Sequence, residues 1–182
     1  MTSTAQIGFL DVTYGSGAAG VACLLADTWT AATPAMEISR CLQCAPAEYV
    51  PGEFYKRELP LLRAVIDDLT PRPSLLVIDG YVWLGAINAP GLGAHLFEAL
   101  HAATPIIGVA KTQYRNDTCS ERVYRGKSRR PLFVTAVGVE TPKAAALVLS
   151  MHGKHRMPTL LKHVDRLARS AITQGCPRAP KT

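Results

Sequence analysis

The N-terminal part of the chain consists of three apolar runs separated by short links. The runs cover residues 7–14, 20–27 and 35–40, and the first link is rich in glycine. Such short links join antiparallel neighbours, whereas parallel strands need a longer crossover. The pattern therefore predicts an antiparallel meander of three strands.

Residues 58–69 carry apolar side chains at the spacing of an amphipathic helix. Proline is tolerated only near the start of a helix, so Pro60 leads us to expect that the regular helix begins close to Glu58. Two prolines that follow residue 69 end it. The segment in front of this helix, residues 43–52, also contains two prolines and is predicted to be a loop.

Two later apolar runs, residues 74–79 and 105–110, are nearly continuous, which is typical of strands buried on both faces of a sheet. The other predicted elements are a loop at 80–91, a helix at 92–102, a polar and basic loop at 116–130, a strand at 132–139, and helices at 141–151 and 159–173. Thr141, followed by Pro142, is predicted to cap its helix. This order of elements is that of the ribonuclease H-like fold, so we expect an α/β protein whose mixed β-sheet is flanked by helices.

The composition is that of a globular chain with a modest basic excess. Of 182 residues, 48% are hydrophobic, which suffices for one domain with a full core, and we assign residues 1–173 to it. The tail, residues 174–182, is expected to be disordered. The formal net charge of +6 suits a polyanionic partner. No apolar run approaches the roughly 20 residues that span a bilayer, and no signal-peptide pattern is found, so we expect a cytoplasmic protein without a membrane partner.

The five cysteines do not predict a disulfide framework, because their number is odd. Cys41 and Cys44 form a CxxC pair. Zinc would need two further ligands, and the sequence contains no second CxxC and no HxxxH. The pair is interpreted as two free thiols near the end of a strand.

Three carboxylates occupy positions where apolar residues are expected. Asp11 interrupts an apolar strand, Asp79 ends the most apolar strand, and Glu58 falls on the apolar face of its helix. Isolated buried carboxylates are costly, and three that converge repel each other unless a cation lies between them. A hard divalent cation such as Mg²⁺, which prefers oxygen ligands, resolves the conflict.

Each carboxylate also has an ordinary structural explanation. An aspartate at a strand end is usually a turn or cap residue, and Glu58 would be favoured by the helix dipole in a first helical turn. Asp11 is harder to explain in this way, because its neighbours are apolar.

Positive charge follows the strand at 105–110. Lys111 could contact a phosphate, orient water or neutralise the carboxylates, and it could equally be an ordinary surface lysine. Tyr114 and Tyr124 are interleaved with basic residues and could stack on bases. The basic set could track a phosphate backbone or form a solvated loop; it consists of Arg115, Arg122, Arg125, Lys127, Arg129 and Arg130.

Five blocks of the sequence, in order, resemble endonuclease V. They are Tyr49-Val50-Pro51-Gly52 with Arg57-Glu58 and Pro60-Leu61-Leu62, then Leu76-Val77-Ile78-Asp79-Gly80, then Gly91-Leu92-Gly93-Ala94-His95-Leu96, then Ile107-Gly108-Val109-Ala110-Lys111-Thr112, and last Arg156-Met157-Pro158-Thr159 with Asp165-Arg166-Leu167-Ala168-Arg169. Each block is short, but their shared order is specific. The resemblance covers roughly residues 7–170.

The resemblance implies a monomeric, ribonuclease H-like enzyme that hydrolyses a phosphodiester near a deaminated base, typically hypoxanthine (inosine), in DNA or RNA. It implies Mg²⁺, for which Mn²⁺ substitutes, held by Asp11, Glu58 and Asp79. Asp165 matches a fourth catalytic position, and Lys111 the lysine of the family motif. The residues expected to bind substrate are Tyr49, Pro51 and Gly52 of the strand-separating wedge, Gly80 near the flipped base, and His95 and Tyr114.

One segment departs from the family pattern. After Asp79-Gly80 the family carries His-Gly and then a His-Pro-Arg stretch, whereas residues 81–90 here are mainly apolar. The change leaves the metal ligands intact and puts the substrate in doubt. A nuclease with another substrate and a non-catalytic nucleic-acid-binding relative therefore remain alternatives.

Overall fold

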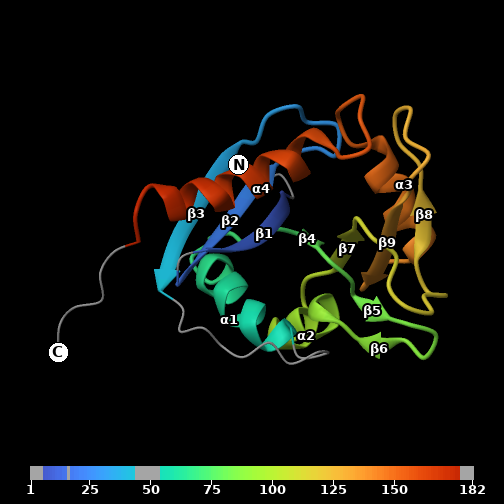
Figure 1. The fold of residues 1–182 in the computed structure, drawn as a ribbon, viewed down its shortest axis with the longest axis horizontal. Helices are drawn as coiled ribbons and strands as arrows, with labels where there is room; N and C mark the ends of the chain where they lie inside the picture. Colours follow the sequence, from blue (N-terminus) through green and yellow to red (C-terminus); the bar gives the residue numbers. More distant parts are fainter. Residues whose placement is uncertain (1–5, 16, 44–53, 177–182) are drawn as a thin grey trace.

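The structure, a computed structural model, describes residues 6–15, 17–43 and 54–176. Its centre is a seven-stranded sheet with the order β3-β2-β1-β4-β7-β9-β8 (Figure 1). The strands are β1 (Ile7–Gly15), β2 (Ala18–Ala26), β3 (Met36–Gln43), β4 (Leu75–Asp79), β7 (Ile106–Ala110), β8 (Glu121–Val123) and β9 (Leu132–Val137). β1, β4 and β7 are parallel, and every other pair in this sheet is antiparallel. The predicted meander and the predicted mixed sheet are both confirmed.

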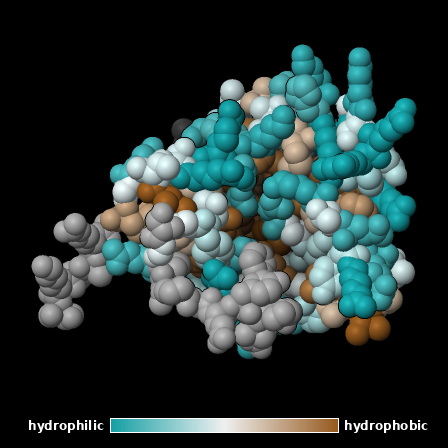
Figure 2. All heavy atoms as spheres, in the orientation of Figure 1, coloured by the Kyte–Doolittle hydropathy of each residue, from teal (hydrophilic) through white to brown (hydrophobic). Residues whose placement is uncertain are grey.

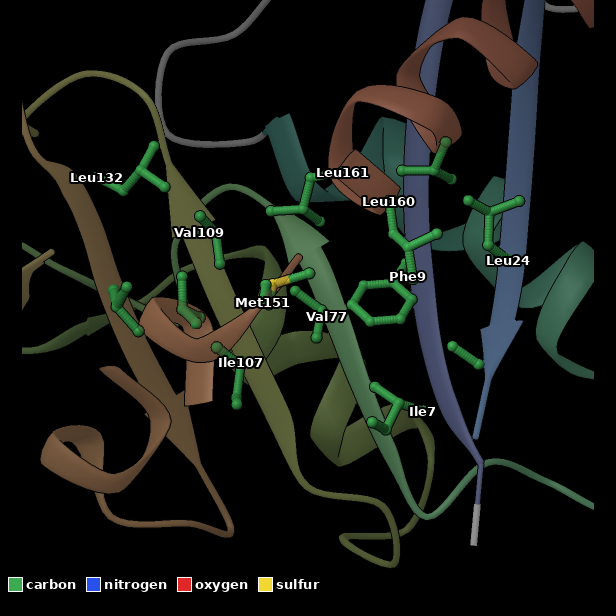
Figure 3. Close-up of a cluster of buried hydrophobic side chains, with 14 of the residues drawn as sticks. Ile7, Phe9, Leu24, Val77, Ile107, Val109, Leu132, Met151, Leu160 and Leu161 are labelled. Atoms are coloured by element: carbon green, nitrogen blue, oxygen red, sulfur yellow. The ribbon is translucent and has the colours of Figure 1, made fainter. Parts of the chain in front are cut away.

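Helices cover both faces of this sheet. α1 (Phe54–Ile66) and α2 (Leu92–Ala99) pack on one face, and α3 (Thr141–Ser150) and α4 (Thr159–Thr173) on the other (Figure 1). Side chains alternate along a strand, so Phe9 belongs to the core under α4, and Leu10 to the core over α1. Figure 3 shows Phe9 and Val77 of the sheet beside Leu160 and Leu161 of α4. Each face of the sheet thus has its own apolar core.

The helix that carries Glu58 begins earlier than the sequence predicts. It starts at Phe54 and ends at Ile66, so Pro60 lies inside it. A proline inside a helix costs about 3 kcal/mol. Burial of the helix's apolar side chains contributes about 1.5–3 kcal/mol each, and four of them are almost fully buried: Leu61, Leu62, Val65 and Ile66. Packing therefore outweighs the local preference.

Several further boundaries differ from the prediction, and two of the differences have a backbone cause. α2 ends at Ala99, because His101 and Ala102 adopt φ of 57° and 55°. β9 ends at Val137, because Gly138 has φ of 75°. The capping prediction for Thr141 is wrong: Glu140 is the N-cap, without a side-chain hydrogen bond, and Thr141 is already helical.

Two predicted loops contain strands. The segment 80–91 includes the short hairpin β5 (Trp83–Leu84) and β6 (Ala89–Pro90), and the basic segment 116–130 includes β8. The predicted loop 43–52 lies, except for Gln43 in β3, outside the described residues, as does most of the tail. Among the described residues, no helix combines the length and apolar character needed to cross a membrane.

Candidate active site

Asp11 and Asp79 lie on adjacent parallel strands, at the point where the β1–β4 ladder ends. Leu10 pairs with Ile78 in that ladder, so the two aspartates occupy the next position on each strand. They also line one small cavity of about 10 Å³, together with apolar side chains that include Leu161 of α4. The two strands therefore bring together residues that are far apart in the sequence.

Glu58, the third predicted carboxylate, reaches the same region from α1. Its exposed fraction is 6%, against 8% for Asp11, and it lies beyond the first turn of the helix, so capping does not explain it. Burial, and then the charges of Asp11 and Asp79, raise the pKa of Glu58 to about 9. All three carboxylates thus share one electrostatic environment.

The pKa of Asp11 is also raised above its ordinary value. Burial is the largest cause, followed by the charges of Asp79 and Asp165, and together they raise the pKa of Asp11 to about 7. The backbone N–H of Val12 donates to Oδ1 of Asp11 at 2.9 Å, which favours the ionised form only in part. Near neutral pH such a cluster takes up protons or a cation.

Lys111 is not an ordinary surface lysine. It follows β7, and its Nζ lies 2.5 Å from Oδ2 of Asp79. Burial lowers the pKa of Lys111, but the hydrogen bond to Asp79 and the charges of Asp79, Asp11 and Asp165 outweigh burial, and the net pKa is raised. The ammonium group is therefore charged and lies against the carboxylate cluster.

Asp165 lies on the α4 side of this cluster. Its charge raises the pKa of Asp11, and its Oδ1 accepts from Nη2 of Arg169 at 3.0 Å, one helical turn away. Val164 and Leu161 of the same helix line the cavity beside Asp11. The predicted fourth carboxylate is thus close enough to Asp11 and Lys111 to act on both electrostatically.

The carboxylates suit a hard divalent cation by their chemistry. Oxygen donors are the ligands that Mg²⁺ prefers, and Asp11 and Glu58 carry raised pKa values, first because they are buried and then because other carboxylates lie near them. As the side chains stand, no three Asp, Glu, His or Cys residues within 6–15, 17–43 and 54–176 form a ready metal-binding group. The three-ligand site therefore stays a prediction that the donor set supports.

The predicted substrate-binding residues fall into several groups. Tyr49, Pro51 and Gly52 lie outside the described residues. Gly80 has φ of 136°, and a Cβ there would meet nothing within 4 Å, so its backbone faces open space beside Asp79. The ring of His95 stacks on that of Tyr55, with centroids 3.6 Å apart and an interplanar angle of 17°.

Tyr114 is part of a small aromatic arrangement that the sequence did not reveal. Its ring meets Tyr81 edge-on, with centroids 5.9 Å apart, and its exposed fraction is 41%. The Tyr81 hydroxyl donates to the Thr112 carbonyl at 2.9 Å and accepts from the Tyr114 N–H at 3.0 Å. Tyr81 therefore fixes the segment that follows Lys111; an amphipathic tyrosine in an otherwise apolar loop was the available signal.

The apolar segment 81–90 is anchored to the sheet. The Val82 N–H donates to Oγ1 of Thr135 at 2.8 Å, and Nε1 of Trp83 donates to the Ala136 carbonyl at 2.9 Å. Ile87, at the tip of the hairpin, is 87% exposed. This segment is a fixed hairpin with an apolar tip.

The six residues of the basic set do not all lie on the surface. Arg125 is only 5% exposed, so neither proposed role, a phosphate track or a solvated loop, applies to it. The other members are exposed: Arg115, Arg122, Lys127, Arg129 and Arg130. Figure 2 shows hydrophilic side chains gathered over the end of the molecule that carries α3 and β8. Cys41, of the CxxC pair, is half-buried near the end of β3, and Cys44 lies outside the described residues.

Comparison with known families gives a match over most of the chain. The family model described as endonuclease V matches residues 2–138. The chain belongs to the endonuclease V family. Endonuclease V of Rhodospirillum centenum is 31% identical over 166 residues, which are 79% of this chain and 66% of that enzyme. The chain thus spans slightly under two-thirds of that endonuclease V.

Solved structures of endonuclease V share the fold. The enzyme from Bacillus subtilis matches with a TM-score of 0.77 at 17% identity, over 93% of this chain and 81% of that one. Endonuclease V of Ciona intestinalis matches with a TM-score of 0.66 at 19% identity, over 93% of this chain and 86% of that one. That structure is the D234N form in complex with a 23-mer DNA that contains an inosine followed by a ribo-adenosine. The ribonuclease H-like fold expected for this endonuclease V family member is confirmed.

Proposed function

We propose that this protein is a Mg²⁺-dependent endonuclease that hydrolyses a phosphodiester bond near a deaminated base in DNA or RNA. The observation that carries the proposal is the pair of almost fully buried carboxylates, Asp11 and Glu58, beside the Asp79–Lys111 ion pair. A protein that only binds nucleic acid has no use for this buried negative charge, because a polyanion is attracted by positive charge.

Asp11, Glu58 and Asp79 would hold the ion, with Asp165 beside them. Mg²⁺ bound there supplies Lewis acidity toward the phosphate and a template for the attacking water. Lys111, already charged and next to Asp79, would neutralise the scissile phosphate or orient the water. Mn²⁺, also a hard cation, would substitute.

The substrate class is proposed from the family relationship and from the open backbone at Gly80. The Ciona intestinalis relative is crystallised with inosine-containing DNA, and Gly80 leaves room for a base beside Asp79. Tyr114 is half-exposed and would stack on a base; Tyr49, Pro51 and Gly52 would form the wedge and His95 would line the site. The protein would act as a cytoplasmic monomer with one domain over residues 1–173.

A second candidate is a nuclease with the same chemistry and a different substrate. The anchored hairpin that carries Ile87 favours it, because an 87% exposed apolar tip stands where the family has polar and basic residues. This candidate shares the carboxylates and Lys111 and differs in which base or structure is accepted.

Cleavage of defined oligonucleotides tests both. Purified protein is incubated with Mg²⁺, Mn²⁺ or EDTA and with labelled DNA or RNA strands that contain inosine, uracil, an abasic site, a flap or no modification. Nicking near inosine that requires the metal and is lost in Asp79→Ala supports the first proposal, and nicking only at another feature supports the second. Absence of metal-dependent cleavage on every strand contradicts both.

A further inference from the structure

Arg125 lies in the turn after β8 and is almost fully buried, yet it has no carboxylate partner among the described residues. Among the described residues, its guanidinium donates only to backbone carbonyls of the last turn of α3 and of the segment that follows it: Leu149 at 3.4 Å in α3, then Met151, Gly153 at 3.2 Å, His155 at 3.1 Å and Arg156 at 3.5 Å. Five carbonyls that point at one buried cation fix the course of this segment.

Arg156 stands at the end of that segment and extends toward the candidate active site. Its Nη2 donates to the Pro131 carbonyl at 2.7 Å and to the Lys111 carbonyl. The β7–β9 ladder ends at the pair Ala110 and Phe133. Lys111 directly follows β7 and Pro131 directly precedes β9, so the two carbonyls lie just beyond the end of this ladder. The Arg156 guanidinium therefore links the residue after β7, Lys111, to the residue before β9, Pro131.

The segment and the turn are packed too closely to move independently. A Cβ at Gly126, next to Arg125, would lie 2.4 Å from the Lys154 carbonyl oxygen, and Gly126 has φ of 60°. Both features require glycine. The same segment leads into α4, which carries Asp165. The contacts that hold this segment therefore position both Lys111 and the start of α4.

We propose that Arg156, held in place by Arg125, is a positioning residue for Lys111 in the cleavage reaction. This inference rests on the proposed function. The side chain of Lys111 is 42% exposed and flexible, so the position of its backbone decides whether Nζ stays on Asp79. Stability alone does not favour the observed arrangement, because Nε of Arg156 is buried without a hydrogen-bond partner among the described residues.

Steady-state kinetics of Arg156→Ala give the first test. Misplacement of a reacting group by about 1 Å can lower a rate about 100-fold, so we expect kcat to fall about 10- to 100-fold with KM changed less than about threefold. Arg156→Lys, which keeps one donor, should recover part of kcat. The matched control is Arg72→Ala, because among the described residues Arg72 pairs only with Asp67, at 3.5 Å, before the start of β4. Circular dichroism establishes that each variant is folded.

Chemical labelling of lysines gives a readout that does not depend on cleavage. In the wild-type protein, acetylation of Lys111 by acetic anhydride should be slow, because its amine is paired with Asp79. In Arg156→Ala it should be several-fold faster and approach the rate in Asp79→Ala, while exposed Lys162 reacts equally in all proteins.

The two tests separate the possible failures. If folded Arg156→Ala labels Lys111 at the wild-type rate, or loses activity through KM alone, Arg156 does not position Lys111. If the wild-type protein cleaves no strand while the labelling changes as expected, the proposed function fails and the structural link between Arg156 and Lys111 stands.

Discussion

The Nζ atom of Lys111 lies 2.5 Å from Oδ2 of Asp79, so one carboxylate of the cluster already has its counter-charge. Asp11 and Glu58 form no ion pair with another described residue, and their pKa values are raised to about 7 and about 9. The site therefore contains one carboxylate that is neutralised by an ion pair and two buried carboxyl groups that burial and neighbouring carboxylates keep from ionising. Removal of the lysine and removal of a buried carboxylate should have different consequences.

Replacement of Lys111 by alanine should lower the rate of cleavage and leave metal binding intact. The loss of one preorganised positive group at a developing charge costs about 10²- to 10³-fold in kcat. Single-turnover cleavage measures this effect. Calorimetric titration with Mn²⁺ should show equal or tighter binding, because Asp79 is released from its ion pair. A cleavage rate within threefold of wild type would show that Lys111 has no role in the chemistry.

The metal-free protein should lose stability as the pH rises. The pKa values of Asp11 and Glu58 are raised in the folded state from the ordinary values of 3.8 and 4.5 to about 7 and about 9. Folded protein thus holds protons that the unfolded chain releases, so the free energy of unfolding from these groups falls between about pH 4 and pH 9. Urea denaturation in EDTA at a series of pH values measures this fall in the free energy of unfolding.

Glu58→Gln should flatten that pH dependence. The amide removes the buried ionisable group, so at pH 9 the variant should be more stable than the wild-type protein by about a few kcal/mol. Glu98→Gln is the matched control, because Glu98 is exposed on α2. Equal slopes for Glu58→Gln and wild type would mean that Glu58 is not the group whose protonation is linked to folding.

Mg²⁺ or Mn²⁺ should raise the melting temperature, and more at pH 8 than at pH 6. Protons compete with the ion for Asp11 and Glu58, whose pKa values are raised. An ion present at 100 times its Kd adds about 2.7 kcal/mol to the free energy of unfolding. Asp11→Asn should abolish most of this shift, whereas Asp27→Asn, at an exposed site at the end of β2, should keep it. An unchanged shift in Asp11→Asn contradicts the metal assignment.

Gly20→Ala should destabilise the fold through the contact between β2 and α4. A Cβ at Gly20 would lie 2.0 Å from the Ala168 carbonyl oxygen, so the helix must move away from the sheet. We expect a loss of about 1–3 kcal/mol, as in other overpacked cores. At Gly15 the nearest atom would be Cδ1 of Ile172, at an ordinary 3.8 Å, so Gly15→Ala should change stability much less. Thermal unfolding of the two variants and of the wild-type protein measures these losses of stability.

Several parts of this structure were predictable because they depend on local pattern. α4 runs from Thr159 to Thr173, as its helical spacing predicts, and the three-stranded meander follows from short links between apolar runs. Asp11, Glu58 and Asp79 stood out because a carboxylate in an apolar context is costly wherever the chain places it. The sequence by itself therefore determined most elements and the identity of the unusual carboxylates.

Other features depend on contacts between segments distant in the sequence. Pro60 lies inside α1, because burial of the helix outweighs the local preference against proline. Arg125 looked like one member of a basic surface, but only the tertiary structure turns five carbonyls toward it. The Lys111–Asp79 pair and the contact of Arg156 with Lys111 join residues 32 and 45 positions apart. No local pattern encodes such contacts, because their energy exists only once the sheet has brought the segments together.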